Sequence, residues 1–283
     1  MTDPDAPADL FDRNRRSQRR ARRLADGEDY FGGLMAEALI ERLDDVTRDF
    51  ADVLVIGGRN TALPEQLRAR GMMVTVVEQS VAIAQAVGAM RGEEDHLPVE
   101  PESFDLILWP GGLESINDVP EALLRCRLAL RPDGLILGCF VGEGSFPRLR
   151  AALAQAEAQR PVARMHPQLD VRGFGDLLRQ IGLALPVIDI DRLSIAYRKL
   201  TTLTRDLRNA ALTNVLAGSV EPLSRRAWSA ACAQFDRPDG DIEPEHIAII
   251  HFSGWAPHPD QPQPARRGSA TASLAAALKP GGA

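Results

Sequence analysis

Hydrophobic residues in the first half of this 283-residue chain alternate between short unbroken runs and helical stripes. Unbroken runs are typical of parallel strands covered on both faces, and stripes at three- and four-residue spacing are typical of the helices between them. The runs lie at 53–56, 72–77, 104–109 and 135–142, and the stripes at 30–43, 81–90, 119–130 and 149–158. The pattern predicts an α/β protein with a doubly wound, mostly parallel sheet over residues 29–192.

The pattern changes after Arg192. A short helix at 176–181 and a strand at 185–190 precede this point, and residues 193–217 then carry an apolar stripe at helical spacing. A second helix is predicted at Arg225–Phe235, and a last strand, His246–Phe252, follows within 243–256. We therefore expect residues 193–242 to form a helical cap inserted before a last strand that runs antiparallel to its neighbours.

The two ends of the chain differ from this core. Residues 1–28 form a basic N-terminal arm with an arginine-rich stretch between Phe11 and Leu24. One interpretation is a solvated helix that docks through those two apolar residues, and the other is a basic lid or an arm for an acidic or RNA surface. Residues 257–283 are rich in Pro, Ala and Gly and are predicted to be a mobile tail.

The clearest chemical signal lies around the first predicted strand. Gly57 and Gly58 follow that strand, and Glu78 ends the second strand about 20 residues later. In a βαβ unit such a turn offers backbone N–H groups, and the acid can accept hydrogen bonds from both ribose hydroxyls of an adenosine. The sequence GGRNTAL lacks the later glycines of a dinucleotide motif, which disfavours NAD and favours S-adenosylmethionine. The alternative is a tight βα turn in a sheet without a cofactor.

Trp109 ends the third buried run at the same predicted sheet edge, so it is a candidate for the wall of a substrate pocket. The alternative role for its side chain is packing alone. The net charge of −6 argues against a general nucleic-acid binder, and no apolar run is long enough to cross a membrane. The three cysteines lack metal-ligand spacing, and the five histidines form no local iron motif, so no metal is expected. Reduced cysteines fit a cytoplasmic compartment, or the mitochondrial matrix for a eukaryotic chain.

Several segments carry a family resemblance. LVIGGRN, VVEQS, the block from Gly92 to Gly138 and LTTLTRDLRNAALTN resemble the S-adenosylmethionine-dependent methyltransferase superfamily. FDRNRR near the start and PARRGSATASLAAAL near the end resemble a narrower branch, the complex I assembly factor 5 (arginine hydroxylase) group. That group is itself similar to the malonyl-acyl-carrier methyltransferases of biotin synthesis. The resemblance implies a seven-strand class I methyltransferase fold and a protein substrate, such as a subunit of respiratory complex I.

The resemblance also implies roles for individual residues. Gly57 and Gly58 would face the methionine part of the cofactor, Glu78 the ribose and Glu93 the adenine. Three departures predict weakened binding: Val55 matches the acid that usually opens the glycine motif, residues 59–61 replace its later glycines, and Glu114-Ser115 matches the His-Trp pair that relatives often carry after the fourth strand. The polar residues of the inserted helix would either face the substrate or form an exposed helix face: Asp206, Arg208 and Asn209.

The resemblance assigns no catalytic residue and leaves three functional classes open. The first is an enzyme that uses S-adenosylmethionine, either for methyl transfer or for related hydroxylase chemistry. The second is a cofactor-poor scaffold that binds a respiratory-complex subunit without turnover. A nicotinamide oxidoreductase is the weakest, because the glycine motif is wrong for it.

Overall fold

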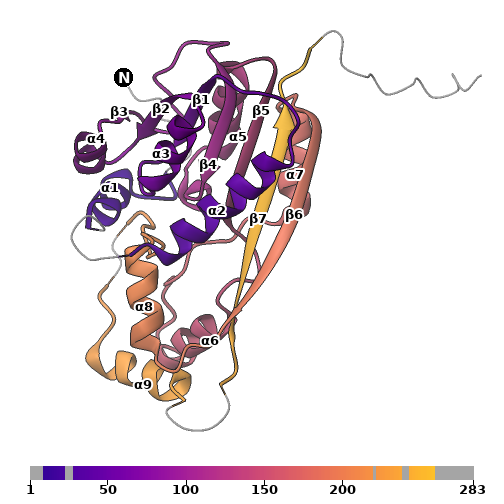
Figure 1. Ribbon diagram of the computed structural model, residues 1–283. Coiled ribbons are helices and arrows are strands. Elements are labelled where there is room, and N and C mark those ends of the chain that lie inside the picture. Colours follow the sequence, from indigo (N-terminus) through magenta and orange to yellow (C-terminus); the bar gives the residue numbers. More distant parts are fainter. Residues whose placement is uncertain (1–8, 23–27, 219–220, 238–241, 259–283) are drawn as a thin grey trace, which may run out of the picture.

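The computed structural model describes residues 9–22, 28–218, 221–237 and 242–258, and within them a seven-stranded sheet carries helices on both faces (Figure 1). The strands are β1 (Asp52–Ile56), β2 (Met73–Glu78), β3 (Met90–Arg91), β4 (Phe104–Pro110), β5 (Leu130–Val141), β6 (Ala184–Ile195) and β7 (Glu245–Trp255). The helices are α1 (Arg13–Arg22), α2 (Tyr30–Asp44), α3 (Ala62–Ala69), α4 (Val81–Val87), α5 (Val119–Ala129), α6 (Pro147–Ala156), α7 (Val171–Gln180), α8 (Leu200–Asn209) and α9 (Arg225–Phe235), with a short 3-10 turn, η2 (Leu113–Ser115).

The sheet order is β3-β2-β1-β4-β5-β7-β6. Strands β1 to β5 pair in parallel, and β7 lies between β5 and β6, antiparallel to both. The predicted fold class is confirmed, including the single antiparallel strand near the C-terminal end of the described chain. Because β5 and β6 run in the same direction as β1, their carboxyl ends lie at the same edge as Gly57 and Glu78.

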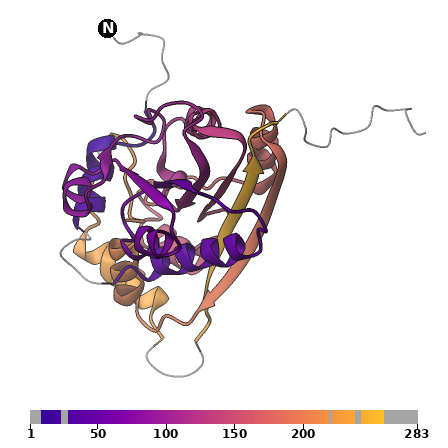
Figure 2. The same ribbon diagram turned by 45° about the horizontal axis from the view of Figure 1, so that its top comes forward.

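Two apolar cores cover the two faces of the sheet. One is built on the face that carries α2, α3, α6, α8 and α9, and the other on the face that carries α5 and α7. The turned view shows α2 crossing the strands on the first face (Figure 2). This helix packs on β4 and β5, because its apolar stripe meets Cys139 and its neighbours in the centre of the first core.

Helices α6, α8 and α9 lie at the carboxyl edge of the sheet, beyond the ends of β5 and β6 (Figure 1). Helix α9 has the predicted bounds, Arg225–Phe235. Strand β6 continues to Ile195, past residue 193 where the insertion was expected to begin, because Leu193 and Ile195 still pair with β7. The helical part of the insertion therefore begins at Leu200.

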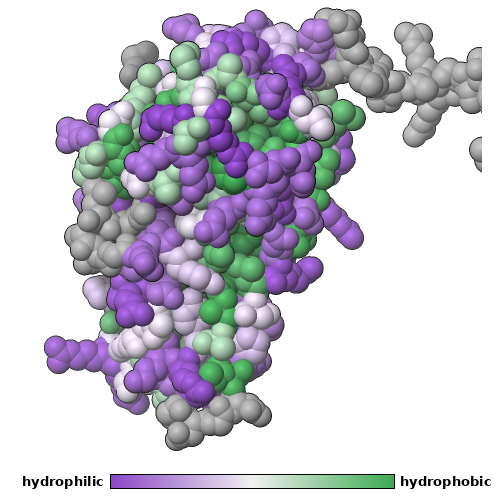
Figure 3. All heavy atoms as spheres, viewed as in Figure 1, coloured by the Kyte–Doolittle hydropathy of each residue, from purple (hydrophilic) through white to green (hydrophobic). Residues whose placement is uncertain are grey.

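Polar side chains cover most of the face shown in Figure 3, and apolar side chains appear between α2 and the lower parts of β6 and β7. Within the described ranges no helix is long and apolar enough to cross a membrane. Leu24 and the expected tail from residue 259 onward lie outside the described residues.

Candidate functional site

Glu78, the predicted ribose acid, ends β2 at the carboxyl edge of the sheet and is 1% exposed. Its carboxylate accepts hydrogen bonds from the backbone N–H of Gly58 at 2.7 Å and of Ser80 at 2.8 Å. The Arg20 guanidinium of helix α1 donates to both of its oxygens, with an Nε–Oε1 distance of 2.8 Å. The side chain of Arg20 is only 4% exposed, so this is a buried, bidentate ion pair.

The electrostatics of this pair follow from its geometry. Burial alone would raise the pKa of Glu78, but the Arg20 guanidinium and the two backbone N–H donors outweigh it and lower the pKa to about 2. Burial likewise opposes the charge on Arg20, yet the Glu78 carboxylate raises the pKa of Arg20 above its usual value. Both groups are therefore charged at neutral pH.

A second arginine of α1, Arg16, lies one turn earlier and is 5% exposed. It donates to both carboxylate oxygens of Glu94 at 2.8 Å and to the side-chain oxygen of Gln79 at 2.8 Å. Its remaining donors reach the Ser115 hydroxyl and the Gly112 carbonyl, both at 3.0 Å. Every nitrogen of this guanidinium therefore donates hydrogen bonds to groups at the carboxyl edge of the sheet.

The third arginine, Arg13, binds two further acids. It donates to both oxygens of Asp95, at 2.9 Å and 2.5 Å, and it also donates to Glu93. Burial would raise the pKa of Asp95, but Arg13 and His96 outweigh it and lower the pKa to about 2. Glu93, which the resemblance placed near the adenine, is thus held by the arm.

The glycine turn lies directly under these guanidinium groups. Gly57 has φ = +97°, a conformation that favours glycine, and a Cβ atom there would lie 3.3 Å from Nη2 of Arg20. A Cβ atom on Gly112 would lie 3.3 Å from Nη2 of Arg16. Asn60 accepts hydrogen bonds from the N–H groups of Ala62 and Leu63, so the first turn of α3 uses its donors internally.

S-adenosylmethionine does not fit this arrangement. The ribose hydroxyls would need Glu78, whose oxygens are filled by Arg20 and by backbone donors. The first two N–H groups of α3 donate to the Asn60 side chain, and Arg59 folds back to form a buried ion pair with Asp29 at 2.8 Å. An adenosine can reach the acid at this edge only after helix α1 has moved.

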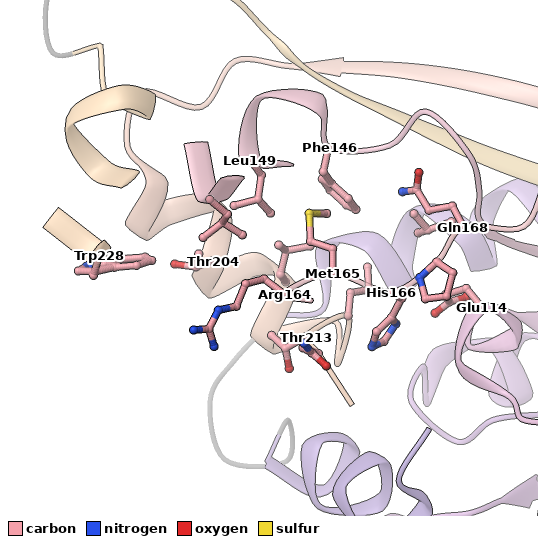
Figure 4. A pocket seen from close by; sticks show the side chains of 16 residues that line it. Glu114, Phe146, Leu149, Arg164, Met165, His166, Gln168, Thr204, Thr213 and Trp228 are labelled. Carbon is pink, nitrogen blue, oxygen red and sulfur yellow. The ribbon is translucent and has the colours of Figure 1, made fainter. Parts of the chain in front are cut away.

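A separate pocket of about 180 Å³ lies beside this edge, between α6, α8, α9 and the chain before α7 (Figure 4). Its walls are mostly apolar, and Met165, Leu207 and Trp228 contribute to them. Glu114, from the turn after β4, lines it as well and accepts a hydrogen bond from the Gly112 N–H at 3.1 Å. In the part of the chain that the structure describes, no ion-pair partner lies within 4.0 Å of this carboxylate.

The other polar groups of the pocket are neutral or paired. Burial lowers the pKa of His166 to about 4, and its Nε2 accepts a hydrogen bond from the Val215 N–H at 2.9 Å. Arg164 forms a half-buried ion pair with Glu157. Glu114 is therefore the charged side chain of the pocket that lacks an ion-pair partner within 4.0 Å among the described residues, and the guanidinium groups of Arg20 and Arg59 act on it at longer range.

Comparison with known proteins places this architecture. Residues 51–138 match the family model described as "Methyltransferase domain". The chain is 30% identical over 285 residues to the Danio rerio protein named arginine-hydroxylase NDUFAF5, mitochondrial, covering 94% of this chain and 88% of that protein. The chain belongs to the methyltransferase superfamily, in the NDUFAF5 branch.

Two other similarities agree with this assignment. The malonyl-[acyl-carrier protein] O-methyltransferase 1 of Coxiella burnetii is 28% identical over 224 residues, covering 77% of this chain and 78% of that protein. The solved structure of the YcgJ protein from Bacillus subtilis has a TM-score of 0.53 at 13% identity, and the match covers 82% of this chain and all of that one. At this identity the structural likeness shows the shared fold alone.

The structure places this NDUFAF5 relative's predicted substrate residues away from the pocket. Trp109 is 1% exposed and packs in the second core, so it forms no wall of the pocket beside Glu114. Asp206 accepts a hydrogen bond from the Tyr197 hydroxyl at 2.9 Å, and Asn209 donates to the Glu28 carbonyl at 3.2 Å. Arg208 is exposed. From the same helix, Thr204 and Leu207 line the pocket instead.

The sequence did not reveal the partners of the arm in this NDUFAF5 relative. The available signal was the spacing of Arg13, Arg16 and Arg20, which places them on one helix face, together with the acidic run 93–95. The signal for Glu114 was its place in the Glu114-Ser115 pair, which stands where relatives often carry His-Trp. Among the described residues, no group of three or more His, Cys, Asp and Glu side chains is placed to hold a metal ion.

Proposed function

We propose that this protein acts in the assembly of respiratory complex I by binding an arginine side chain of a protein subunit in the pocket beside Glu114. The observation that carries the proposal is a carboxylate without an ion-pair partner among the described residues, set at an apolar pocket at the functional edge of the sheet. The near full-length similarity to proteins named arginine hydroxylase supports the choice of arginine.

The pocket suits a guanidinium on an aliphatic stem. The charged head can form two charge-assisted hydrogen bonds with Glu114, and the methylene groups can pack on Met165 and Leu207. His166 adds no competing positive charge, because its low pKa keeps it neutral at pH 7. Since Arg164 is already paired with Glu157, it does not repel an incoming cation as a free arginine would.

A second candidate is an enzyme that uses S-adenosylmethionine, for methyl transfer or for hydroxylase-type chemistry. Glu78 at the tip of β2 and the Gly57-Gly58 turn favour it, because both hold their superfamily positions. In the described arrangement these groups are taken by the arm. We therefore base the proposal on recognition of the subunit, and propose that this protein acts in the cytoplasm of a bacterial cell, or in the mitochondrial matrix of a eukaryotic cell.

Peptide binding tests the proposal. We expect a peptide with one arginine between apolar residues to bind at least tenfold more tightly than the same peptide with citrulline, which keeps the shape and loses the charge. Glu114→Gln should abolish this preference. Glu143→Gln is the matched control, because Glu143 is exposed and does not line the pocket. Equal affinity for the two peptides in the unchanged protein would contradict the proposal.

The role in the cell needs its own experiment. A strain that lacks this protein should contain less assembled complex I in its membranes, measured by native gel electrophoresis with an NADH-dependent activity stain. The unchanged protein and the Glu143→Gln variant should restore the complex, and Glu114→Gln should not. An unchanged amount of assembled complex I in the deleted strain would contradict the assembly role and would leave the peptide result unaffected.

A further inference from the structure

We infer that helix α1 occupies the site that an adenosine would use, at the carboxyl edge of the sheet beside Gly57 and Glu78. Docking of this helix and binding of an adenosine cofactor therefore exclude each other. The inference goes beyond the proposed function, because recognition of a subunit at Glu114 does not require it. It concerns the face of α1 that carries Arg13, Arg16 and Arg20 and the acids that this face contacts.

The exclusion follows first from hydrogen bonding. To bind Glu78, the two hydroxyls of a ribose would have to donate the hydrogen bonds that Nε and Nη2 of Arg20 now donate to its two carboxylate oxygens. The carboxylate already accepts from Gly58 and Ser80, and its side chain has no exposed surface. There is no oxygen left on Glu78 that a ribose could use while Arg20 is in place.

The second reason for the exclusion is that the arm already fills the space beside the glycine turns. The guanidinium groups of Arg16 and Arg20 lie 3.3 Å from the positions that Cβ atoms on Gly112 and Gly57 would take. Glycine at such turns normally lets a ligand approach the backbone closely. In this protein the close approach is made by the arm.

The arm is matched to the edge by charge. Each of the three inward arginines meets its own acid or acids: Arg13 meets Asp95 and Glu93, Arg16 meets Glu94, and Arg20 meets Glu78. The opposite face of α1 carries residues that are exposed to solvent, Asn14, Gln18 and Arg22. In an arginine-rich helix that only covered the surface, the guanidinium groups would be exposed to water and would not be buried against acids.

The same contacts make the helix exchangeable. The buried residues of α1 itself are Arg16 and Arg20, so the helix docks by ion pairs and not by apolar side chains. A buried ion pair gains little net free energy, because the loss of hydration nearly cancels the attraction. A ligand that also binds these acids can therefore compete with the helix.

The start of the arm is fixed separately. Phe11 is buried against Leu216, its N–H donates to Asn117 at 2.7 Å, and Asp12 N–H donates to the Val215 carbonyl at 2.8 Å. Helix α1 can thus leave the edge while the chain at residue 11 stays attached. The ring of Phe11 also contacts His166 of the pocket, with ring centroids 4.9 Å apart.

Isothermal titration of the full chain with S-adenosylmethionine tests the inference. Three proteins are compared with the unchanged one: Arg20→Gln, the double variant Arg16→Gln/Arg20→Gln, and the control Arg22→Gln on the exposed face. We expect the double variant to bind at least tenfold more tightly than the unchanged protein, Arg20→Gln to lie between them, and Arg22→Gln to match the unchanged protein. Thermal melting establishes that each variant is folded.

Hydrogen exchange provides the second measurement, which does not depend on affinity. In each protein that binds S-adenosylmethionine, the ligand should speed exchange of the amides of residues 13–22. Equal affinities in all four proteins would overturn the inference, and so would a folded double variant that does not bind. Ligand binding that slows exchange in α1 would also overturn it. None of these results alters the preference for arginine over citrulline at Glu114, so the two proposals fail separately.

Discussion

At the scale of single residues, the most consequential contact is the buried pair between Arg20 and Glu78. Removal of one partner of such a pair usually destabilises a protein by about 3–5 kcal/mol, because the other charge stays buried. Here the arginine belongs to helix α1, which we infer can leave the edge, and the acid belongs to the end of β2 within the sheet. The cost of breaking the pair should therefore appear as undocking of the arm, with the sheet unaffected.

The variant Glu78→Gln tests this expectation. Amides of residues 13–22 should exchange at least tenfold faster than in the unchanged protein, and amides of β1 and β4 should keep their protection. Glu143→Gln, at an exposed position beyond β5, is the control and should change neither. A variant in which the sheet and the arm lose protection together would show that α1 is an integral part of the core.

Docking of the arm should weaken at low pH. The pKa of Glu78 is lowered to about 2 in the folded protein, against roughly 4.3 for an unperturbed glutamate. The pair therefore contributes its full stability above about pH 4.3, and the contribution is lost as pH falls toward 2. Exchange of α1 amides, corrected for intrinsic rates, should be constant from pH 8 to 5 and should rise below pH 4. In Glu78→Gln this rise should be smaller, with the remainder coming from Asp95, whose pKa Arg13 and His96 also lower to about 2. A rise of equal size would assign it to groups other than Glu78.

Among the helices and strands, some glycines occupy positions where a side chain would clash, and others occupy positions with room for one. A Cβ atom on Gly138 of β5 would lie 2.3 Å from the ring of Phe252 on β7, whereas a Cβ atom on Gly33 of α2 would meet nothing within 4 Å. Gly138→Ala should lower the free energy of unfolding by about 1–3 kcal/mol through overpacking. Gly33→Ala should raise it by about 0.5–1 kcal/mol through helix propensity. Chemical denaturation measures both, and equal effects would contradict the packing described for β5 and β7.

The elements also show what the sequence could predict. The apolar runs and stripes predicted the βαβ core, and they placed α9 to the residue, because these features depend on local periodicity. The end of β6 was missed, since Leu193 and Ile195 fit a helical stripe as well as a strand, and only pairing with β7 decides between them. Strand β3 is too short to leave a pattern.

The site was less predictable for a related reason. Glu78 was found because it ends a recognisable strand, but its partner Arg20 lies 58 residues away in the sequence. Complementarity between a basic helix face and an acidic edge is a property of the folded chain. The burial of Trp109 likewise depends on the helices packed over β4 and not on its place at the strand end.

At the scale of the whole molecule, the protein keeps the methyltransferase fold and closes its usual ligand edge with its own N-terminal segment (Figure 1). The pocket beside Glu114 remains open to a partner. Contacts of Phe11 and Val215 with His166 join the arm to that pocket. We therefore expect Phe11→Ala to loosen α1 and also to weaken binding of the arginine peptide, with Leu10→Ala, at an exposed neighbour, as the control. Hydrogen exchange and peptide titration on the same samples check both effects.

The position of α1 during ligand binding shows whether the helix leaves the edge when the cofactor enters. Spin labels on cysteines introduced at Gln18 of α1 and Gln66 of α3, both exposed, with Cys232 replaced by Ala, report the distance between the helix and the edge by pulsed electron paramagnetic resonance. Without ligand we predict one narrow distance distribution. S-adenosylmethionine, at a concentration that saturates the Arg20→Gln variant, should add a broad population of longer distances in that variant. Saturation with ligand while the narrow distribution stays unchanged would contradict the account.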